Sequence, residues 1–148
     1  SRLLTPDYSR KPGLLCAAKG HATMNLNQIT LPAIDIKESA AFFSKMGFIQ
    51  IVEAEHYARF ECPQGEATFS IHKTSQVQSG NGAVLYFEIK DLDAKVAQLK
   101  ALGFSFTQEP QDEPWLWREA RLNDPSGNAI CLYWAGKNRK NPPWRIGA

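Results

Sequence analysis

Cysteines are few in this chain, and long apolar runs are missing. The 148 residues include only Cys16, Cys62 and Cys131, which are widely spaced and form no C-x-x-C pair. An odd, scattered set favours free thiols in a reducing compartment over a disulfide framework. No apolar run approaches the roughly 20 residues that cross a bilayer. We therefore expect a cytoplasmic protein with no membrane association.

The chain also lacks an excess of charge of either sign. Seventeen Lys and Arg residues against 15 Asp and Glu residues give a formal net charge of +2. So weak a field predicts no nucleic-acid partner. No glycine-rich phosphate loop is present and no elbow motif for a serine nucleophile. With 43% hydrophobic and 22% charged residues, the composition is that of a globular domain.

What the chain does have is an internal repeat. The segment Ile34-Asp35-Ile36 is followed by a helical pattern and then by Met46-Gly47-Phe48. The same order returns 56 residues later as Lys90-Asp91-Leu92, a helical pattern and Leu102-Gly103-Phe104. Two copies are too few for a solenoid. They predict two related modules that enclose a cavity, where small molecules bind.

The same order of elements is predicted in both modules. Asp35 with Glu38 forms a capping-box pattern for a helix that Gly47 ends, and Asp91 or Asp93 caps a helix that Gly103 ends. Alternation and turn residues predict eight strands, at 28–34, 48–52, 57–62, 67–73, 84–89, 104–107, 115–122 and 128–134.

These elements predict an α+β fold of two tandem βαβββ modules with curved mixed sheets around a cavity. We place an irregular N-terminal extension at 1–23, one domain at 24–136 with modules at about 25–77 and 83–135, and a basic C-terminal tail at 137–148. Residues 75–82 form a linker rich in Ser, Gln and Gly.

Three stretches resemble the vicinal oxygen chelate superfamily, over about residues 25–135. They are Leu31-Pro-Ala-Ile-Asp-Ile with Phe42-Phe43 and Gly47-Phe48; Phe87-Glu-Ile-Lys-Asp-Leu with Leu102-Gly103-Phe104; and Trp115-Leu-Trp-Arg-Glu-Ala with Asp124-Pro-Ser-Gly-Asn. This superfamily includes glyoxalase I, extradiol dioxygenases, fosfomycin-resistance enzymes and bleomycin-resistance proteins. The third stretch is the most specific and is especially similar to the bleomycin-resistance branch.

The resemblance implies four metal-ligand positions, one on each of four strands. Metal-dependent members carry His or Gln, then Glu, His and Glu. The matching positions here are Gln28, Ser70, Val84 and Cys131. This set has no carboxylate to offset a divalent charge, and valine cannot ligate. We therefore expect no metal and no other cofactor, which argues against lyase and dioxygenase chemistry.

Strand alternation separates residues that pack on the helices from residues that face the cavity. The former are Ile29, Leu31, Phe69, Ile71, Leu85, Phe87, Ile130 and Leu132. We expect the ligand-binding residues to be Gln28, Ser70, His72, Tyr86, Glu88, Trp115, Trp117, Arg118, Cys131 and Tyr133. Arg118 and Glu119 are neighbours and point to opposite faces of a regular strand. We expect one of them to contact a ligand and the other to join an ion pair. No catalytic residue is assigned.

Three functions compete. The first is a metal-independent binding protein of the resistance type, a homodimer that sequesters an aromatic or planar small molecule, as in antibiotic resistance. The slightly basic chain argues against bleomycin itself, because a large cationic drug favours an acidic protein. The second is a lyase or dioxygenase with a metal site rearranged onto Gln28, His72 and Cys131. The third is an interaction domain whose cavity is filled by Tyr86, Tyr133, Trp115 and Trp117.

Overall fold

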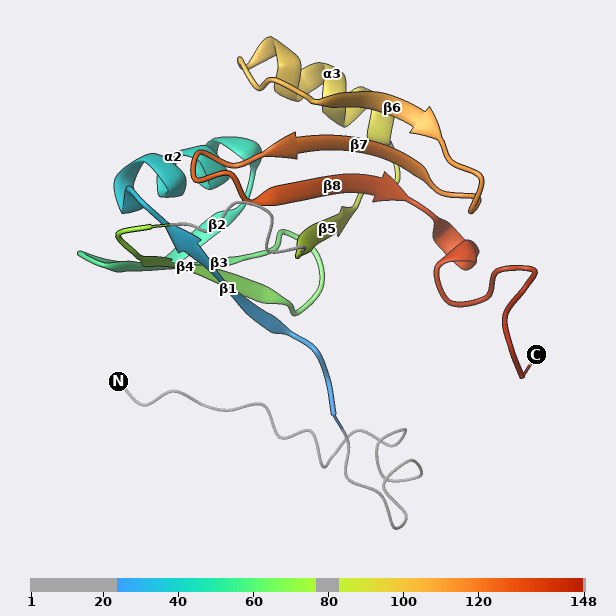
Figure 1. The fold of residues 1–148 in the computed structure, drawn as a ribbon, viewed down its shortest axis with the longest axis horizontal. Coiled ribbons are helices and arrows are strands. Elements are labelled where there is room, and N and C mark those ends of the chain that lie inside the picture. Colours follow the sequence, from blue (N-terminus) through green and yellow to red (C-terminus); the bar gives the residue numbers. More distant parts are fainter. Residues whose placement is uncertain (1–23, 77–82, 148) are drawn as a thin grey trace.

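The computed structural model describes residues 24–76 and 83–147, which form two modules of four strands and one helix (Figure 1). The first module contains β1 (Gln28–Ala33), α2 (Ile36–Met46), β2 (Ile49–Ala54), β3 (Tyr57–Glu61) and β4 (Thr68–Lys73). The second contains β5 (Val84–Glu88), α3 (Leu92–Ala101), β6 (Gln108–Asp112), β7 (Arg118–Asn123) and β8 (Ala129–Trp134), followed by the short helix η2 (Gly136–Asn138). The predicted α+β fold of two tandem βαβββ modules is confirmed.

Each module builds a mixed sheet with the same strand order. The orders are β1-β4-β3-β2 and β5-β8-β7-β6, and in each sheet the first pair is parallel and the others are antiparallel. Figure 1 shows the two sheets as separate layers. The expected extension at 1–23 and residues 77–82 of the linker lie outside the described residues. The domain limits at 24 and 136 remain predictions.

Helix α2 begins and ends as predicted. The side chain of Asp35 accepts a hydrogen bond from the backbone N–H of Glu38 at 3.0 Å. Gly47 follows the last helical residue at φ +120°, a conformation that a side chain disfavours. Asp91 precedes α3 but makes no side-chain cap bond, and Asp93 lies in its first turn.

Two strand predictions in the second module are wrong. The strand expected at 104–107 is found later in the chain, as β6. This strand includes Pro110, which is tolerated because β6 lies at the edge of its sheet. The strand expected at 115–122 begins only at Arg118. Leu116 has φ +67°, a left-handed conformation that ends regular strand geometry, so Trp115 and Trp117 lie in the connection before β7.

The side chains predicted to pack on the helices do so, with one exception. The helix-facing side chains of both sheets and both helices share one core cluster, which includes Phe43, Phe69, Leu99 and Leu132. Cys131 and Tyr133, from the intervening positions of β8, form a separate small cluster on the opposite face. Ile29 is 37% exposed because it lies on β1, at the edge of its sheet.

The loop between β7 and β8 fastens the two modules together. Asn128 Nδ2 donates to the carbonyl of Pro32 at 2.9 Å, and the N–H of Ile34 donates to Ser126 Oγ at 2.9 Å. The loop is itself shaped by the buried carboxylate of Asp124, which accepts bonds from Ser126 N and from Asn128 N and Nδ2. Desolvation by burial raises the pKa of this carboxyl group.

Candidate functional site

A cavity of about 1570 Å³ lies between the modules. Both modules contribute to its wall: the edge strands β1 and β5 run along it, and α3 and the loop after β3 complete it. Four predicted ligand-binding residues line it, namely Gln28, Tyr86, Glu88 and Tyr133. A space of this size exceeds what one drug-sized ligand needs, so the aromatic side chains do not fill the cavity as an interaction domain would require.

An aromatic cluster on the outer face of the second sheet borders this cavity. The rings of Trp117 and Tyr133 are stacked, with centroids 4.5 Å apart and planes 16° apart. The ring of Tyr86 meets both edge-on, at 5.9 and 5.6 Å. Tyr86 remains 44% exposed. The cluster therefore offers a ligand one accessible ring on a rigid aromatic base.

A buried carboxylate lies beside the aromatic cluster. Glu119 is only 1% exposed, and it accepts hydrogen bonds from Trp115 Nε1 at 2.7 Å and from an Arg121 terminal nitrogen at 2.8 Å. The same nitrogen of Arg121 donates to the Tyr86 hydroxyl at 3.4 Å. The buried charge is thus neutralised within its own strand and helps to hold Tyr86 in position.

Cys131 lies on the same face but has no nucleophilic character. It is fully buried opposite Arg121 in the register of β7 and β8. Desolvation, reinforced by Glu119, raises the pKa of its thiol to about 12. A thiol that holds its proton so firmly does not supply a thiolate at neutral pH.

Glu88 holds the C-terminal segment. Its Oε2 accepts hydrogen bonds from the backbone N–H groups of Ala135 and Gly136, at 3.0 and 2.9 Å. Trp117 Nε1 donates to the carbonyl of Asn138 at 3.3 Å. These contacts fix the start of the predicted basic tail against the second module. Glu88 therefore has a structural partner in addition to its place on the cavity wall.

The outer face of the first sheet carries a polar cluster. Ser70 is fully buried, and its Oγ accepts a bond from Gln28 Nε2 at 2.8 Å and lies 2.7 Å from Thr30 Oγ1. On the neighbouring strand, Arg59 Nε donates to the Tyr57 hydroxyl at 2.9 Å. A hydrogen bond to Ser70 and the Arg59 guanidinium both lower the pKa of Tyr57.

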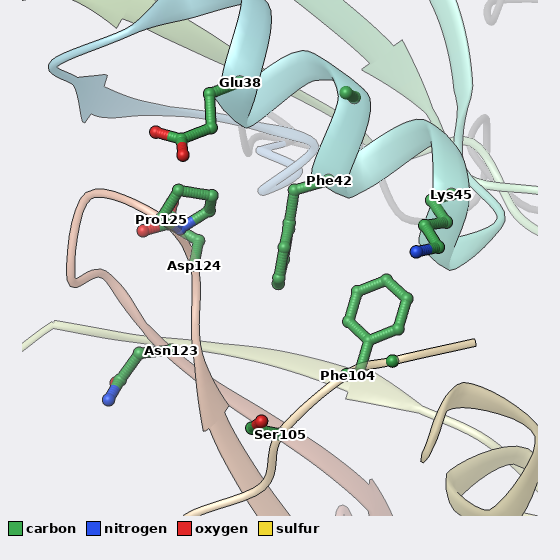
Figure 2. Close-up of a pocket in the computed structure, with 10 residues that line it drawn as sticks. Glu38, Phe42, Lys45, Phe104, Ser105, Asn123, Asp124 and Pro125 are labelled. Atoms are coloured by element: carbon green, nitrogen blue, oxygen red, sulfur yellow. The ribbon is translucent and has the colours of Figure 1, made fainter. Parts of the chain in front are cut away.

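A second, smaller pocket of about 390 Å³ lies between α2 and the second module. Figure 2 shows Phe42 reaching from α2 toward Pro125 and Phe104, with Lys45 beside the Phe104 ring. Glu38 and Asp124 also line it. None of the predicted ligand-binding residues lines this pocket.

A family model described as "Glyoxalase/Bleomycin resistance protein/Dioxygenase superfamily" matches residues 25–132. The chain belongs to this superfamily. The modules, their strand order and the cavity between them are thus a variant of the superfamily's fold. A search of curated proteins returned no match.

Solved structures of the superfamily share the fold at low identity. A glyoxalase/bleomycin resistance protein/dioxygenase from Nocardioides has 18% identity and a TM-score of 0.68, and covers 90% of this chain and 97% of its own. A bleomycin-binding protein in complex with bleomycin has 19% identity and a TM-score of 0.62, with 75% and 98% covered. A lactoylglutathione lyase from Agrobacterium tumefaciens has 16% identity and a TM-score of 0.63, with 77% and 96% covered. At these identities the likeness shows the fold alone.

The superfamily's metal positions do not fit a metal in this chain. Gln28 is bonded to Ser70 and Thr68, Val84 is aliphatic, and Cys131 is a buried neutral thiol. Within residues 24–76 and 83–147, no three His, Cys, Asp or Glu side chains come together as a metal-binding group. No reaction step is therefore assigned to a metal.

The rearranged site expected on Gln28, His72 and Cys131 is not assembled within one chain. Gln28 lies opposite Thr68, whereas His72 lies opposite Pro32, four residues further along β1 and about 13 Å away. Cys131 belongs to the other sheet. His72 and Cys131 likewise belong to different sheets.

Arg118 lies on the other side of β7 from Glu119. Its guanidinium forms ion pairs with Asp93 at 2.8 Å and Asp112 at 3.0 Å, which join α3 to β6 and β7. Arg118 lowers the pKa of Asp93, and the two aspartates together raise the pKa of Arg118. A ligand role for Arg118 stays a prediction, and the residue already has two carboxylate partners.

Sequence analysis did not include four residues of the outer sheet faces among the expected binding residues. They are Tyr57, Arg59, Glu119 and Arg121. A signal was available in β3, because Tyr57 and Arg59 alternate with the buried Ala58 and Phe60. Applied to β3 and β7 as it was to the other strands, the period of two places all four on the outer faces, opposite the core.

Within the described ranges no helix combines the length and the apolar character that crossing a bilayer requires.

Proposed function

We propose that this protein is a metal-independent, cytoplasmic binding protein of the resistance type, which sequesters an aromatic or planar small molecule. The observation that carries the proposal is the cavity of about 1570 Å³ with the exposed Tyr86 ring at its border. Stacked and edge-on aromatic contacts favour planar ligands. The superfamily relative that holds bleomycin supports the class of function, although the net charge of +2 argues for a different ligand.

The test is a fluorescence-quenching screen of aromatic small molecules against purified protein. We expect Trp117→Leu to weaken binding about tenfold, because it removes the ring that supports Tyr86. Trp144→Leu is the matched control, since Trp144 is 57% exposed and lies outside the cluster. Equal affinities of the two variants would argue against the aromatic cluster as the binding surface.

We also propose that the protein works as a homodimer. The outer faces of both sheets point away from the shared core, and Ile49 and Ile51 are exposed on the edge strand β2. Exposed apolar edges of this kind favour association with a second chain.

The alternative is a metal-dependent lyase or dioxygenase, and its support is the lactoylglutathione lyase relative. Elemental analysis and calorimetric titration with Ni²⁺, Zn²⁺, Mn²⁺ and Fe²⁺ distinguish the two functions. Stoichiometric metal that is lost in His72→Ala or Cys131→Ala would support the enzyme. Absence of binding at micromolar metal would support the sequestering protein.

A further inference from the structure

The two modules carry an arginine at the same position of their outer faces. In the first sheet Arg59 of β3 lies opposite Ser70 of β4, which in turn lies opposite Thr30 of β1. In the second sheet Arg121 of β7 lies opposite Cys131 of β8, which lies opposite Tyr86 of β5. The strand order is the same, so Arg59 and Arg121 are equivalent.

The charge of the two arginines is balanced differently. Arg121 is paired at 2.8 Å with the buried Glu119, two residues before it on β7. The equivalent residue on β3 is Tyr57, a neutral phenol that only accepts a hydrogen bond from Arg59 Nε. Within residues 24–76 and 83–147, no carboxylate lies within the 4.0 Å of an ion pair with Arg59. Glu61, two residues on along the same face, is exposed and forms no such pair.

The surroundings of Arg59 hold it in place. Its guanidinium carbon lies 5.4 Å from the centroid of the Tyr57 ring, and both residues are half-buried. Nε is used by Tyr57, and the hydrogen bonds of the described residues include none from the two terminal amino groups. These groups form the planar fork that binds carboxylates and phosphates with two parallel hydrogen bonds.

Arg59 reaches the cavity wall only through the polar cluster, because neither Arg59 nor Tyr57 lines the cavity. Arg59 lies opposite Ser70 in the strand register, and Ser70 accepts a bond from Gln28, which lines the cavity. The face thus presents a half-buried cation among neutral hydrogen-bonding groups, two strands away from Gln28 of the cavity wall.

We propose that Arg59 and Tyr57 form an anion subsite, which binds the carboxylate or phosphate group of an aromatic ligand. The inference rests on the proposed binding function and names the class of its ligand, an aromatic acid. It gives the Arg59 guanidinium an anionic partner that the described residues do not provide.

Three probes of similar shape test it: benzoate, phenyl phosphate and the neutral benzamide. Binding is followed by the ¹⁵N–¹H signals of the arginine Nε–H and tryptophan indole groups. We expect at least one anion to bind about tenfold to a hundredfold more tightly than benzamide and to shift the Arg59 signal. Which of the two binds more tightly identifies the group as carboxylate or phosphate.

Arg59→Gln should abolish the preference for the anions, and Arg59→Lys should keep part of it because the charge remains. Arg145→Gln is the matched control, since Arg145 is exposed in the C-terminal segment, where it bonds to Asn141. The thermal unfolding midpoint of each variant establishes that it folds. A preference that survives Arg59→Gln would overturn the subsite.

The remaining outcomes separate this inference from the proposed function. Equal binding of all three probes that is lost in Trp117→Leu would overturn the subsite and support the aromatic site. Shifts at Arg59 that Trp117→Leu leaves unchanged would support the subsite and contradict the aromatic site. No shift with any probe at tens of millimolar would contradict both.

Discussion

Among single residues, Ser39 is a polar group without a partner. It is fully buried in α2, and its hydroxyl is the one buried side-chain oxygen or nitrogen of the described residues that makes no hydrogen bond. A buried unpaired hydroxyl costs about 1–3 kcal/mol.

Ser39→Ala should therefore raise the free energy of unfolding, by about 1 kcal/mol, because alanine removes the unpaired group and favours the helix. Urea denaturation measures the change. The matched control is Ser44→Ala on the exposed side of the same helix, which gains helix propensity alone. A loss of stability in Ser39→Ala would show that the hydroxyl has a partner.

The two described cysteines should differ sharply in reactivity. Burial raises the pKa of both thiols, but Cys131 is fully buried with a pKa of about 12, whereas Cys62 is half-buried on the cavity wall. At pH 8 iodoacetamide should modify Cys62 first and reach Cys131 only when the protein unfolds. Peptide mass mapping over time measures both rates. Rapid labelling of native Cys131 would contradict its buried position.

At the scale of elements, the β7–β8 loop has a larger effect than its turn chemistry suggests. Its sequence, Asp124-Pro-Ser-Gly-Asn, predicts only a tight turn. In the structure Asn128 bonds both to Asp124 within the loop and to the carbonyl of Pro32 in the other module. A local motif thus carries a contact between modules.

Asn128→Ala should destabilise the protein by about 2–3 kcal/mol, because it leaves the buried Asp124 carboxylate and the Pro32 carbonyl each short of a donor. Urea denaturation gives the change. The control is Asn123→Ala, an exposed residue at the end of β7, for which we expect a change within about 0.5 kcal/mol. Equal effects of the two variants would show that the intermodule bond contributes nothing.

Element prediction failed where one residue departed from its local pattern. Trp115 to Leu122 alternates as a strand does, but Leu116 is held in the left-handed region and the strand begins three residues late. Pro110 reads as a turn residue, yet β6 is an edge strand in which a missing N–H costs no ladder bond. The error at Pro110 arose because a position at the sheet edge overrode local preference, and the error at Leu116 arose because this one residue is left-handed.

At the scale of the whole molecule, stability should fall at alkaline pH. Burial raises the pKa of Cys131, to about 12, and also that of Tyr133. The folded state therefore keeps these protons after the unfolded chain has lost them. The two protonated groups contribute their full stabilisation of the fold below their ordinary pKa values of 9.0 and 10.0. This stabilisation is lost as the pH rises through the pKa values of the folded state. Tyr57, with a lowered pKa, acts in the opposite direction.

Each group contributes a slope of up to about 1.4 kcal/mol per pH unit. Urea denaturation at pH 8 and at pH 11 should show a decrease in the free energy of unfolding. This decrease should be smaller in Cys131→Ala than in the wild-type protein. A stability that rises over this range would contradict the assignment.

Association can be tested through the exposed edge of the first sheet. Ile51→Lys should shift the proposed dimer toward the monomer, because it places a charge on an apolar edge strand. Size-exclusion chromatography with light scattering measures the mass. Lys37→Ala, on the exposed surface of α2, serves as the control. A wild-type protein that is already monomeric would rule out the homodimer.

The sequence by itself determined the two modules, their helices and the face of most strands, because these depend on spacing: a repeat of 56 residues, capping residues, and alternation with a period of two. It also showed that valine and serine stand where the superfamily places metal ligands. Only the tertiary structure decided which polar groups pair. It separated Gln28 from His72, bound Arg118 to two aspartates, gave Arg121 the buried Glu119 and left Arg59 with a tyrosine. Pairing depends on which strands become neighbours, and strands distant in the sequence meet only when the sheets form.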